Sequence, residues 1–205
     1  SNLTQSTFFR VVTKNGACAE TVSSIPVKIT VARGGTVSAS QGTEFCAPST
    51  ATTLSLSNLE GTSYVWESAV SPFSSWSAVA SNVPSIPVSG LTETTRYRVN
   101  VNTNRAFSNE ITITVSAPTV QGSLSTANAT VCENDGTART INLTGNTGAV
   151  LRWESSTTNG EPWSPILQTS TGLTFSNLPN SIYYRVVVKN GACTQAVTAS
   201  LQIIV

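Results

Sequence analysis

The sequence contains an internal repeat, and this feature constrains the fold more than any other. The string Trp66-Glu67-Ser68 returns as Trp153-Glu154-Ser155, and Tyr97-Arg98-Val99 returns as Tyr184-Arg185-Val186. Both pairs are offset by the same 87 positions, counted from Trp66 to Trp153 and from Tyr97 to Tyr184, and no gap is needed between them. A constant period indicates tandem copies of one structural unit that stack along the chain.

A third, partial copy occupies the start of the chain. The string Lys14-Asn15-Gly16-Ala17-Cys18 is identical to Lys189-Asn190-Gly191-Ala192-Cys193. We therefore predict the C-terminal strands of an incomplete repeat in residues 1–33, followed by complete repeats in 34–117 and 118–205. Because two or three strands cannot bury a two-sided core, we expect residues 1–33 to be ordered only when upstream sequence or another chain completes them.

The fold class predicted for each repeat is all-β. Short alternating runs are separated by turn residues, and no helical period is present. In the last repeat the runs are Ala129–Cys132, Arg139–Thr144, Val150–Ser155, Trp163–Leu167, Leu173–Phe175, Ile182–Lys189 and Ala196–Val205. Seven short strands in one such repeat are typical of an immunoglobulin-like sandwich. The chain is therefore predicted to consist of tandem immunoglobulin-like β-sandwich repeats.

Three details refine this prediction. Trp66 and Trp153 fall in the middle of a strand, where immunoglobulin-like folds bury a tryptophan between the sheets. Tyr97 and Tyr184 each follow a leucine by six positions, which is the spacing of a tyrosine corner. The pair Asn190-Gly191 lies between two β runs and favours a type I′ turn, because both residues tolerate positive φ angles.

The four cysteines include no C-x-x-C pair, and the sequence has no histidine, so a zinc site is not expected. Widely spaced cysteines indicate disulfides and an oxidising compartment. We predict a Cys132–Cys193 bond within the last repeat, with Cys18 and Cys46 unpaired in this segment. A Cys18–Cys46 bond between neighbouring repeats should be out of reach, and Ala106 stands where the middle repeat would carry its hairpin cysteine.

The composition excludes several kinds of catalytic site. Without histidine, Ser-His-Asp and Cys-His arrangements are impossible, and Asp135 is the only aspartate of the chain. The repeated acids Glu67 and Glu154 are expected to face solvent or to pair with Arg98 and Arg185. We therefore expect no enzyme activity, no bound metal and no cofactor.

Two further tryptophans are candidates for a ligand surface. Trp76 and Trp163 follow loops rich in Pro, Ser and Gly, and could form an aromatic platform for sugars. The competing interpretation is that each covers the core at the edge of its sandwich. Both interpretations stay open at this point.

Charge is sparse, at 10% of residues with a formal net charge of +1. Such a chain attracts polyanions weakly, so nucleic acid is not an expected partner. The sequence contains no run of 18 apolar residues and no signal peptide, so we expect no direct membrane insertion. It contains no methionine, and we expect it to be an internal segment of a longer precursor.

Several strings resemble a known family. They are Arg152-Trp153-Glu154-Ser155-Ser156, Trp163 with Ile166, and the run from Tyr183 to Cys193. These strings are similar to the tandem immunoglobulin-like repeats of giant cell-surface adhesins of Bacteroidota, the SprB-like gliding-motility adhesins exported by the type IX system. The resemblance implies an extracellular location at the cell surface, a filament of stacked domains, and a role in attachment or gliding.

The leading hypothesis is thus a structural and adhesive repeat segment. Its expected partners are other repeats of the same long chain, with cell-envelope proteins or surface glycans as further possibilities. An alternative is a carbohydrate-binding or accessory module of a secreted polysaccharide-degrading enzyme, and a third is a protein–protein scaffold at the cell envelope.

Overall fold

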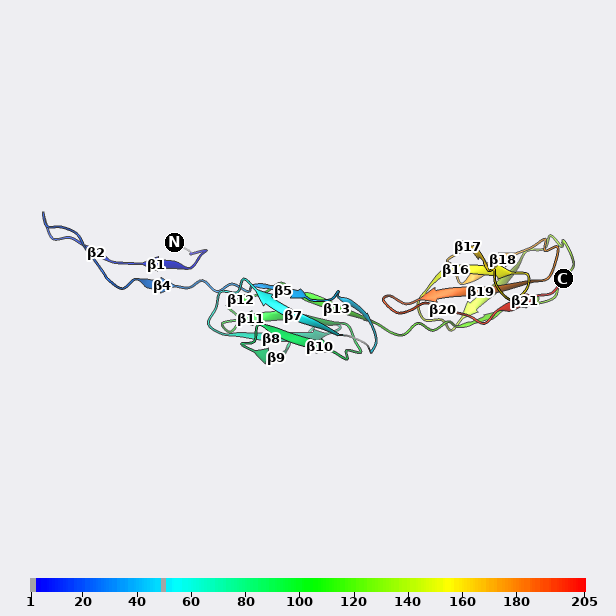
Figure 1. Cartoon of the computed structure of the whole chain (residues 1–205), viewed down its shortest axis with the longest axis horizontal. Helices are drawn as coiled ribbons and strands as arrows, with labels where there is room; N and C mark the ends of the chain where they lie inside the picture. The colour runs from blue at the N-terminus through cyan, green and yellow to red at the C-terminus, as the bar shows by residue number, and fades with distance from the viewer. Residues whose placement is uncertain (1–2, 49–50) are drawn as a thin grey trace. The chain divides into compact units, whose positions relative to one another are not determined.

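The computed structural model describes residues 3–48 and 51–205, and every regular element within them is a β-strand. The chain divides into two compact units, whose strands are drawn as arrows in Figure 1. The first comprises Ser1–Thr43, Ala51–Ser89 and Thr94–Ile113, and the second comprises Glu44–Thr50, Gly90–Glu93 and Thr114–Val205. Three short segments that precede residue 118 in the sequence therefore belong to the second unit.

The first unit contains a sandwich of two sheets. The smaller sheet has the order β10-β7-β5, and the larger contains β13, β11, β8 and β9, with β12 paired to β11. Strands alternate between buried and exposed side chains, as in β7 and β10, because successive side chains point to opposite faces of a sheet. The strands are β5 (Thr36–Ala39), β7 (Ala51–Ser57), β8 (Tyr64–Val70), β9 (Ser77–Ser81), β10 (Ser85–Ser89), β11 (Thr95–Val101), β12 (Ala106–Phe107) and β13 (Ile111–Ser116).

The core of this sandwich is built around Trp66 on β8. Its side chain is completely buried, and its Nε1 donates a hydrogen bond to the carbonyl oxygen of Val83 at 2.8 Å. Aliphatic side chains from both sheets are also completely buried, with Leu54 from the smaller sheet and Val99 and Ile113 from the larger one. The predicted burial of the mid-strand tryptophan is confirmed.

The second unit contains a sandwich of the same kind. Strands β14-β15-β18 form one sheet, and β17-β16-β19-β20 form the other, with β21 also paired to β19. Trp153 occupies the position of Trp66, and its Nε1 donates to the carbonyl oxygen of Ser170 at 3.0 Å. The strands of this sandwich are β14 (Ser123–Ser125), β15 (Arg139–Thr144), β16 (Ala149–Ser156), β17 (Ser164–Ile166), β18 (Gly172–Phe175), β19 (Ile182–Lys189), β20 (Ala196–Val197) and β21 (Leu201–Ile203). Strand β6 (Glu44–Cys46) is in neither of these two sheets, and it pairs with the end of β13 at the edge of the sheet that contains β13.

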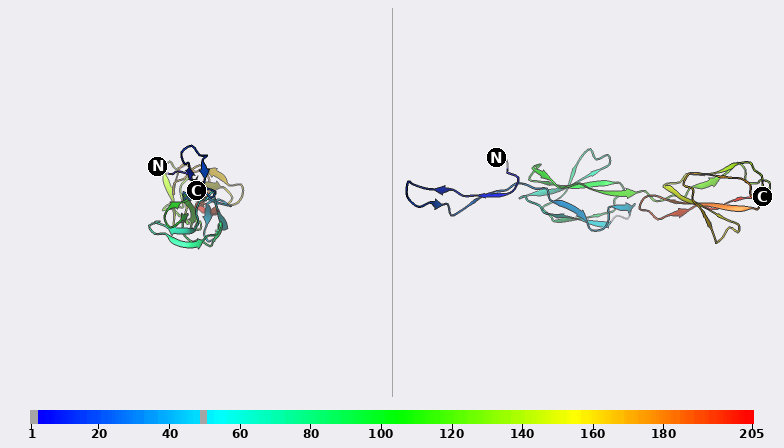
Figure 2. Two further views of the ribbon diagram at one scale, coloured as in Figure 1. Left: turned by 90° about the vertical axis from the view of Figure 1, so that its left-hand side faces the viewer. Right: turned by 90° about the horizontal axis from the view of Figure 1, so that it is seen from above.

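Residues 3–33 belong to the first unit and form two antiparallel strand pairs (Figure 2). Strand β1 (Thr7–Phe9) pairs with β4 (Val27–Ile29), and β2 (Val12–Thr13) pairs with β3 (Thr21–Val22). Every side chain from Phe8 to Thr30 is exposed. Within residues 3–33 the two strand pairs have no second sheet over them, and their apolar side chains are uncovered. That they become ordered only with a completing partner stays a prediction.

Two local predictions need correction. The turn after β19 has a positive φ at Gly191 but not at Asn190, so it is not the predicted type I′ turn, which needs two successive positive φ angles. Residues 129–132 make only an isolated parallel bridge, between Thr130 and Ile204. The first strand of this sandwich is instead β14, which is short and rich in serine and was not recognised in the sequence.

Candidate functional site

The outer face of each larger sheet carries a paired carboxylate and guanidinium group. In the second sandwich, Glu154 on β16 lies opposite Arg185 on β19. The Nε of Arg185 donates to Oε2 of Glu154 at 2.6 Å, and the Nε of Arg152 donates to Oε1 at 2.7 Å. Both carboxylate oxygens are thus satisfied by cationic donors, which are the stronger hydrogen-bond partners.

Glu154 is only 5% exposed, so its ionisation depends on these partners. Burial on its own would raise the pKa of Glu154, but hydrogen bonds from Arg185 and then Arg152 outweigh it, and the pKa is lowered. The carboxylate therefore stays charged and paired at neutral pH. A general acid needs the opposite shift, towards a raised pKa, so the environment of Glu154 favours a structural ion pair over acid–base chemistry.

In the first sandwich Glu67 is bound in the same way as Glu154, except that an asparagine replaces one of the two arginine donors. The Nε of Arg98 donates to Oε2 of Glu67 at 2.8 Å, while the side-chain amide of Asn100 donates to Oε1 at 2.8 Å. Asn100 takes the role of Arg152, but from the neighbouring strand β11. The predicted pairing of Glu67 with Arg98 and of Glu154 with Arg185 is confirmed.

The candidate ligand tryptophans stack on these same arginines. The guanidinium carbon of Arg98 lies 4.0 Å from the ring centroid of Trp76, and that of Arg185 lies 4.0 Å from the ring centroid of Trp163. Both indoles are half-buried. One face of each ring is therefore occupied by a cation–π contact within its own repeat. Sequence reasoning missed that Phe107 also contacts Arg98, at 4.3 Å.

The cysteines require the main correction. Cys46 and Cys193 form a disulfide with a Cα–Cα distance of 4.7 Å, whereas Cys18 and Cys132 are free and exposed. The predicted Cys132–Cys193 bond is wrong, and so is the prediction that Cys46 is unpaired. Of the four cysteines, only Cys18 is in its predicted state, which is an unpaired thiol.

The physical reason lies in strand β6. This strand runs parallel to the end of β13, with Phe45 opposite Val115 and Cys46 opposite Ser116. Cys46 therefore lies where the last strand of its repeat ends, not where the first strand begins. In the following repeat Cys132 likewise lies beside the last residues, since the amide of Val131 donates to the carbonyl of Ile204. Cys132 and Cys193 are thus at opposite ends of one sandwich.

The hairpin that carries Cys193 packs on the junction between the two sequence repeats. The side-chain amide of Asn190 donates to the carbonyl of Ala117 at 2.8 Å, and its backbone amide donates to Oγ1 of Thr119 at 3.0 Å. A Cβ atom on Gly191 would collide with the side chain of Ser116, and Gly191 also has a φ of 48°. Glycine is therefore required at this position both by the turn and by the close packing.

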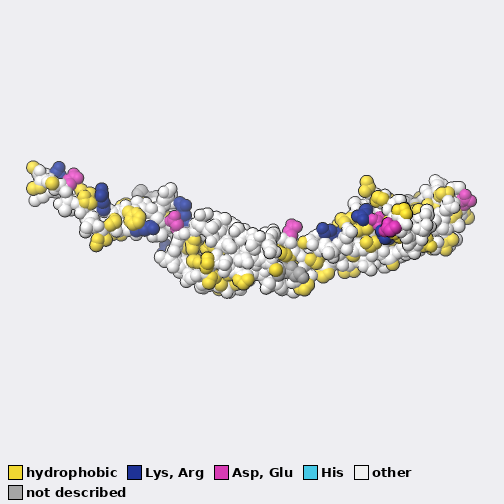
Figure 3. Space-filling model, viewed as in Figure 1, with side chains coloured by type: hydrophobic (Ala, Val, Ile, Leu, Met, Phe, Trp, Pro, Cys, Tyr) yellow, Lys and Arg dark blue, Asp and Glu magenta, His cyan; other side chains and the backbone are white. Residues whose placement is uncertain are grey.

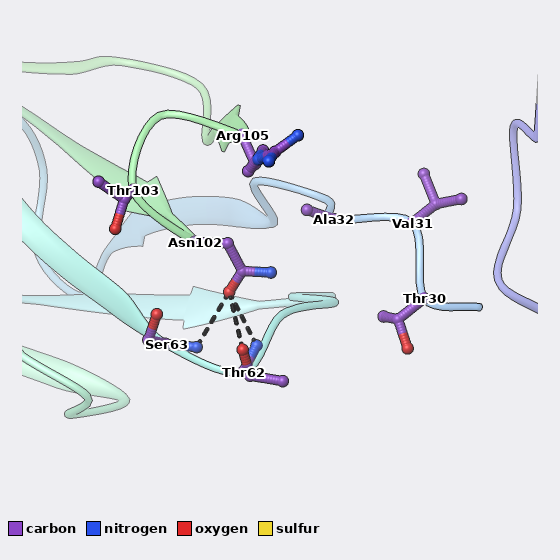
Figure 4. A pocket seen from close by; sticks show the side chains of 8 residues that line it. All are labelled: Thr30, Val31, Ala32, Thr62, Ser63, Asn102, Thr103 and Arg105. Atoms are coloured by element: carbon purple, nitrogen blue, oxygen red, sulfur yellow. Dashed lines mark hydrogen bonds between the residues drawn. The ribbon is translucent and has the colours of Figure 1, made fainter. Parts of the chain in front are cut away.

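A polar pocket of about 530 Å³ lies within the first unit (Figure 4). The Oδ1 of Asn102 accepts hydrogen bonds from the backbone amides of Thr62 and Ser63 at 3.0 and 3.1 Å. Arg105 is the only charged side chain among its lining residues. Asn102 therefore fixes a loop of the middle repeat, at the hairpin that departs from the Lys-Asn-Gly-Ala-Cys pattern.

The rest of the described surface carries few charged groups. Figure 3 shows Lys, Arg, Asp and Glu side chains gathered in small groups on a face that is mostly neutral. Within residues 3–48 and 51–205, no three His, Cys, Asp or Glu side chains are grouped as metal ligands. Over the same residues, no helix has the length and apolar character needed to cross a membrane.

Comparison with known proteins identifies one sequence family. The family described as "Domain of unknown function (DUF8696)" matches residues 33–117 and again residues 120–205. No curated protein matches the chain. Among solved structures, murine CEACAM1b aligns with a TM-score of 0.46 and 15% identity, over 82% of this chain and 98% of its own. The FN1–FN3 domains of chicken CNTN1 align with a TM-score of 0.35 and 17% identity, over 82% of this chain and 65% of their own.

Proposed function

We propose that this chain, which belongs to the DUF8696 family of domains, is a structural and adhesive segment of a long extracellular filament at the cell surface. The observation that carries the proposal is the Cys46–Cys193 disulfide, since it bonds residues of two successive sequence repeats to each other. A disulfide that ties one repeat to the next suits a stalk that must transmit load. It also fits an oxidising compartment outside the cytoplasm.

We further propose a particular class of surface protein for this segment. The strings around Trp153 and Tyr184 resemble repeats of gliding-motility adhesins of Bacteroidota, so we place the chain in a type IX secreted adhesin that serves attachment or gliding. Its partners would be further repeats of the same chain, and cell-envelope proteins or surface glycans bound weakly through many copies. Multivalency strengthens such weak contacts without any new interaction. The paired state of Glu67 and Glu154 supports a role without catalysis.

The proposed stalk role predicts a specific response to force. When the chain is pulled from its two ends, the intact disulfide shields the residues between Cys46 and Cys193, a sequence separation of 147. At about 3.4 Å per extended residue, reduction should add roughly 50 nm to the fully extended length. Single-molecule stretching with and without a reducing agent measures this difference directly.

The control for this experiment is Cys46→Ser, which should give the longer extension under both conditions. Cys132→Ser should behave like the unmodified chain, because Cys132 is free. If the oxidised chain extended to its full length, the disulfide would not carry the load and the stalk role would lose its support.

The accessory-module alternative makes a different prediction about glycans. One face of Trp76 and one face of Trp163 are already covered by arginine. We therefore expect residues 34–205 to show no measurable affinity for simple polysaccharides in calorimetry. Binding that disappears in a folded Trp76→Ala, Trp163→Ala double variant would favour the accessory module over the stalk.

A further inference from the structure

Cys132 occupies in its repeat the position that Cys46 occupies in the preceding one. Both cysteines follow residues that run parallel to the last strand of their own repeat, at Phe45–Val115 in one and Thr130–Ile204 in the other. Cys46 is bonded, whereas Cys132 is free and exposed. Within the described residues, the same structural position thus carries a disulfide in one repeat and a free thiol in the next.

The surroundings of Cys132 form a hollow of about 850 Å³ in the second unit. It is lined by the loop around Cys132, by Pro179 and Asn180, and by Val205. The corresponding segments one repeat earlier are Glu44–Thr50, Gly90–Glu93 and the residues from Thr114 onward. These are the segments that cluster with the following repeat instead of with their own sandwich. The hollow beside Cys132 is therefore the equivalent of an occupied docking surface.

The loop that carries Cys132 is held in place before any partner binds. The amide of Asn134 donates to the carbonyl of Leu178, and the amide of Asn177 donates to the carbonyl of Asp135. Arg139 and then Thr137 donate to the Asp135 carboxylate and lower its pKa to about 2. A hairpin that docks here meets a preformed surface and loses little free energy to ordering it.

The chain also carries a second copy of the matching hairpin. Lys14–Cys18 has the same five residues as Lys189–Cys193, and both turns close with an amide of the cysteine donating to the asparagine carbonyl, at 3.1 and 2.9 Å. Gly16 has a φ of 55°, close to the 48° of Gly191. A Cβ on Gly16 would meet no atom within 4 Å, whereas the same atom on Gly191 meets Ser116. The first hairpin thus has the conformation of the docked one, with open space beside Gly16.

We propose that Cys132 and its hollow are the acceptor site for the Lys-Asn-Gly-Ala-Cys hairpin of another repeat, whose cysteine forms a disulfide with Cys132. The Lys14–Cys18 hairpin of a second copy of this chain is such a donor, and the resulting bond is Cys18–Cys132. This goes beyond the stalk role, since it assigns a covalent acceptor and donor pair to the two free thiols. The donor and acceptor are different surfaces, so the contact is heterologous.

The bond forms by thiol–disulfide exchange with a small disulfide such as oxidised glutathione. The Cys132 thiolate attacks one glutathione sulfur, which breaks the glutathione disulfide and releases one glutathione thiolate. The Cys18 thiolate then attacks the Cys132 sulfur of the mixed disulfide and releases the second glutathione thiolate. Two protein thiols are oxidised, one glutathione disulfide is reduced, and both thiol protons pass to the released glutathiones.

The test uses the whole chain with its Cys46–Cys193 bond intact, in a glutathione redox buffer, followed by non-reducing electrophoresis and peptide mapping. We expect a ladder of covalent oligomers linked through Cys18 and Cys132. Cys18→Ser alone and Cys132→Ser alone should stay monomeric, and their mixture should stop at the dimer. Dimers of Cys18→Ser alone, linked between two Cys132 residues at the rate of the mixture, would overturn the proposal.

A matched control separates docking from simple thiol exposure. In a Cys18→Ser, Ala19→Cys variant the exposed thiol moves by one position on the same hairpin, where Ala19 is also exposed. We expect its coupling to Cys132 to be slower by about tenfold or more, because exchange requires the two sulfurs to approach in a defined geometry. An unchanged coupling rate would show that accessibility alone drives the reaction and would contradict docking.

Discussion

Trp153→Ala is expected to destabilise the second sandwich by about 3–5 kcal/mol, because truncation of a buried aromatic residue leaves a cavity. Trp153 is 0% exposed, packs against both sheets and donates a hydrogen bond to Ser170, whose carbonyl the variant would leave without this partner. A single domain has only about 5–15 kcal/mol of stability in total. The melting temperature of this sandwich should therefore fall by roughly 15 °C or more, as measured by calorimetry.

The same repeat offers a matched control for this substitution. Trp163→Ala removes an identical side chain from a half-buried position on the outer face, where it mainly contacts Arg185. Its loss should cost about 1 kcal/mol, the typical size of a partly exposed cation–π contact. If Trp153→Ala is unfolded at all temperatures, Trp153→Phe provides a folded intermediate case. Equal effects of Trp153→Ala and Trp163→Ala would contradict the described core.

Loss of the Cys46–Cys193 disulfide is expected to have an effect of similar size. When the second sandwich unfolds while the first stays folded, Ser116 is held beside Cys46 by the pairing of β6 with β13. The disulfide then closes a loop from Ser116 to Cys193. On the chain-entropy argument, a loop of this length stabilises the folded state by about 4 kcal/mol. Cys193→Ser should lower the melting temperature of the second sandwich by roughly 15 °C or more.

The first sandwich should also melt at a lower temperature in Cys193→Ser, because Trp66 and Leu54 lie between Cys46 and Cys193 in the sequence. When the first sandwich unfolds while the second stays folded, Asn190 holds the hairpin beside Ala117, and the disulfide closes a loop from Cys46 to Ala117. Cys132→Ser serves as the control, since an exposed free thiol should change stability by less than about 0.5 kcal/mol. A Cys193→Ser variant with an unaltered melting profile would contradict a stabilising bond.

The sequence alone determined the local structure of each repeat. Alternating side chains located β15 and β19 at their observed bounds, because the period of two follows directly from strand geometry. The tryptophan of each repeat is buried as predicted. The Glu–Arg pairs were also predictable, since residues opposite each other on neighbouring strands interact once the strands are aligned. Strand β14 was missed because its Ser-Leu-Ser run has too little alternation to identify.

The cysteine pairing was decided by the tertiary structure. A sequence separation does not tell which end of a sandwich a residue reaches, and the parallel pairing of β6 with β13 takes Cys46 to the end opposite the one we inferred. The stacking of Trp76 on Arg98 was hidden for the same reason, since it depends on how a loop after β8 folds back over the sheet. Local patterns thus determined the strands and their faces. The packing of the whole fold decides which loops and strand ends lie next to each other. For this reason only the tertiary structure shows that Cys193 bonds with Cys46.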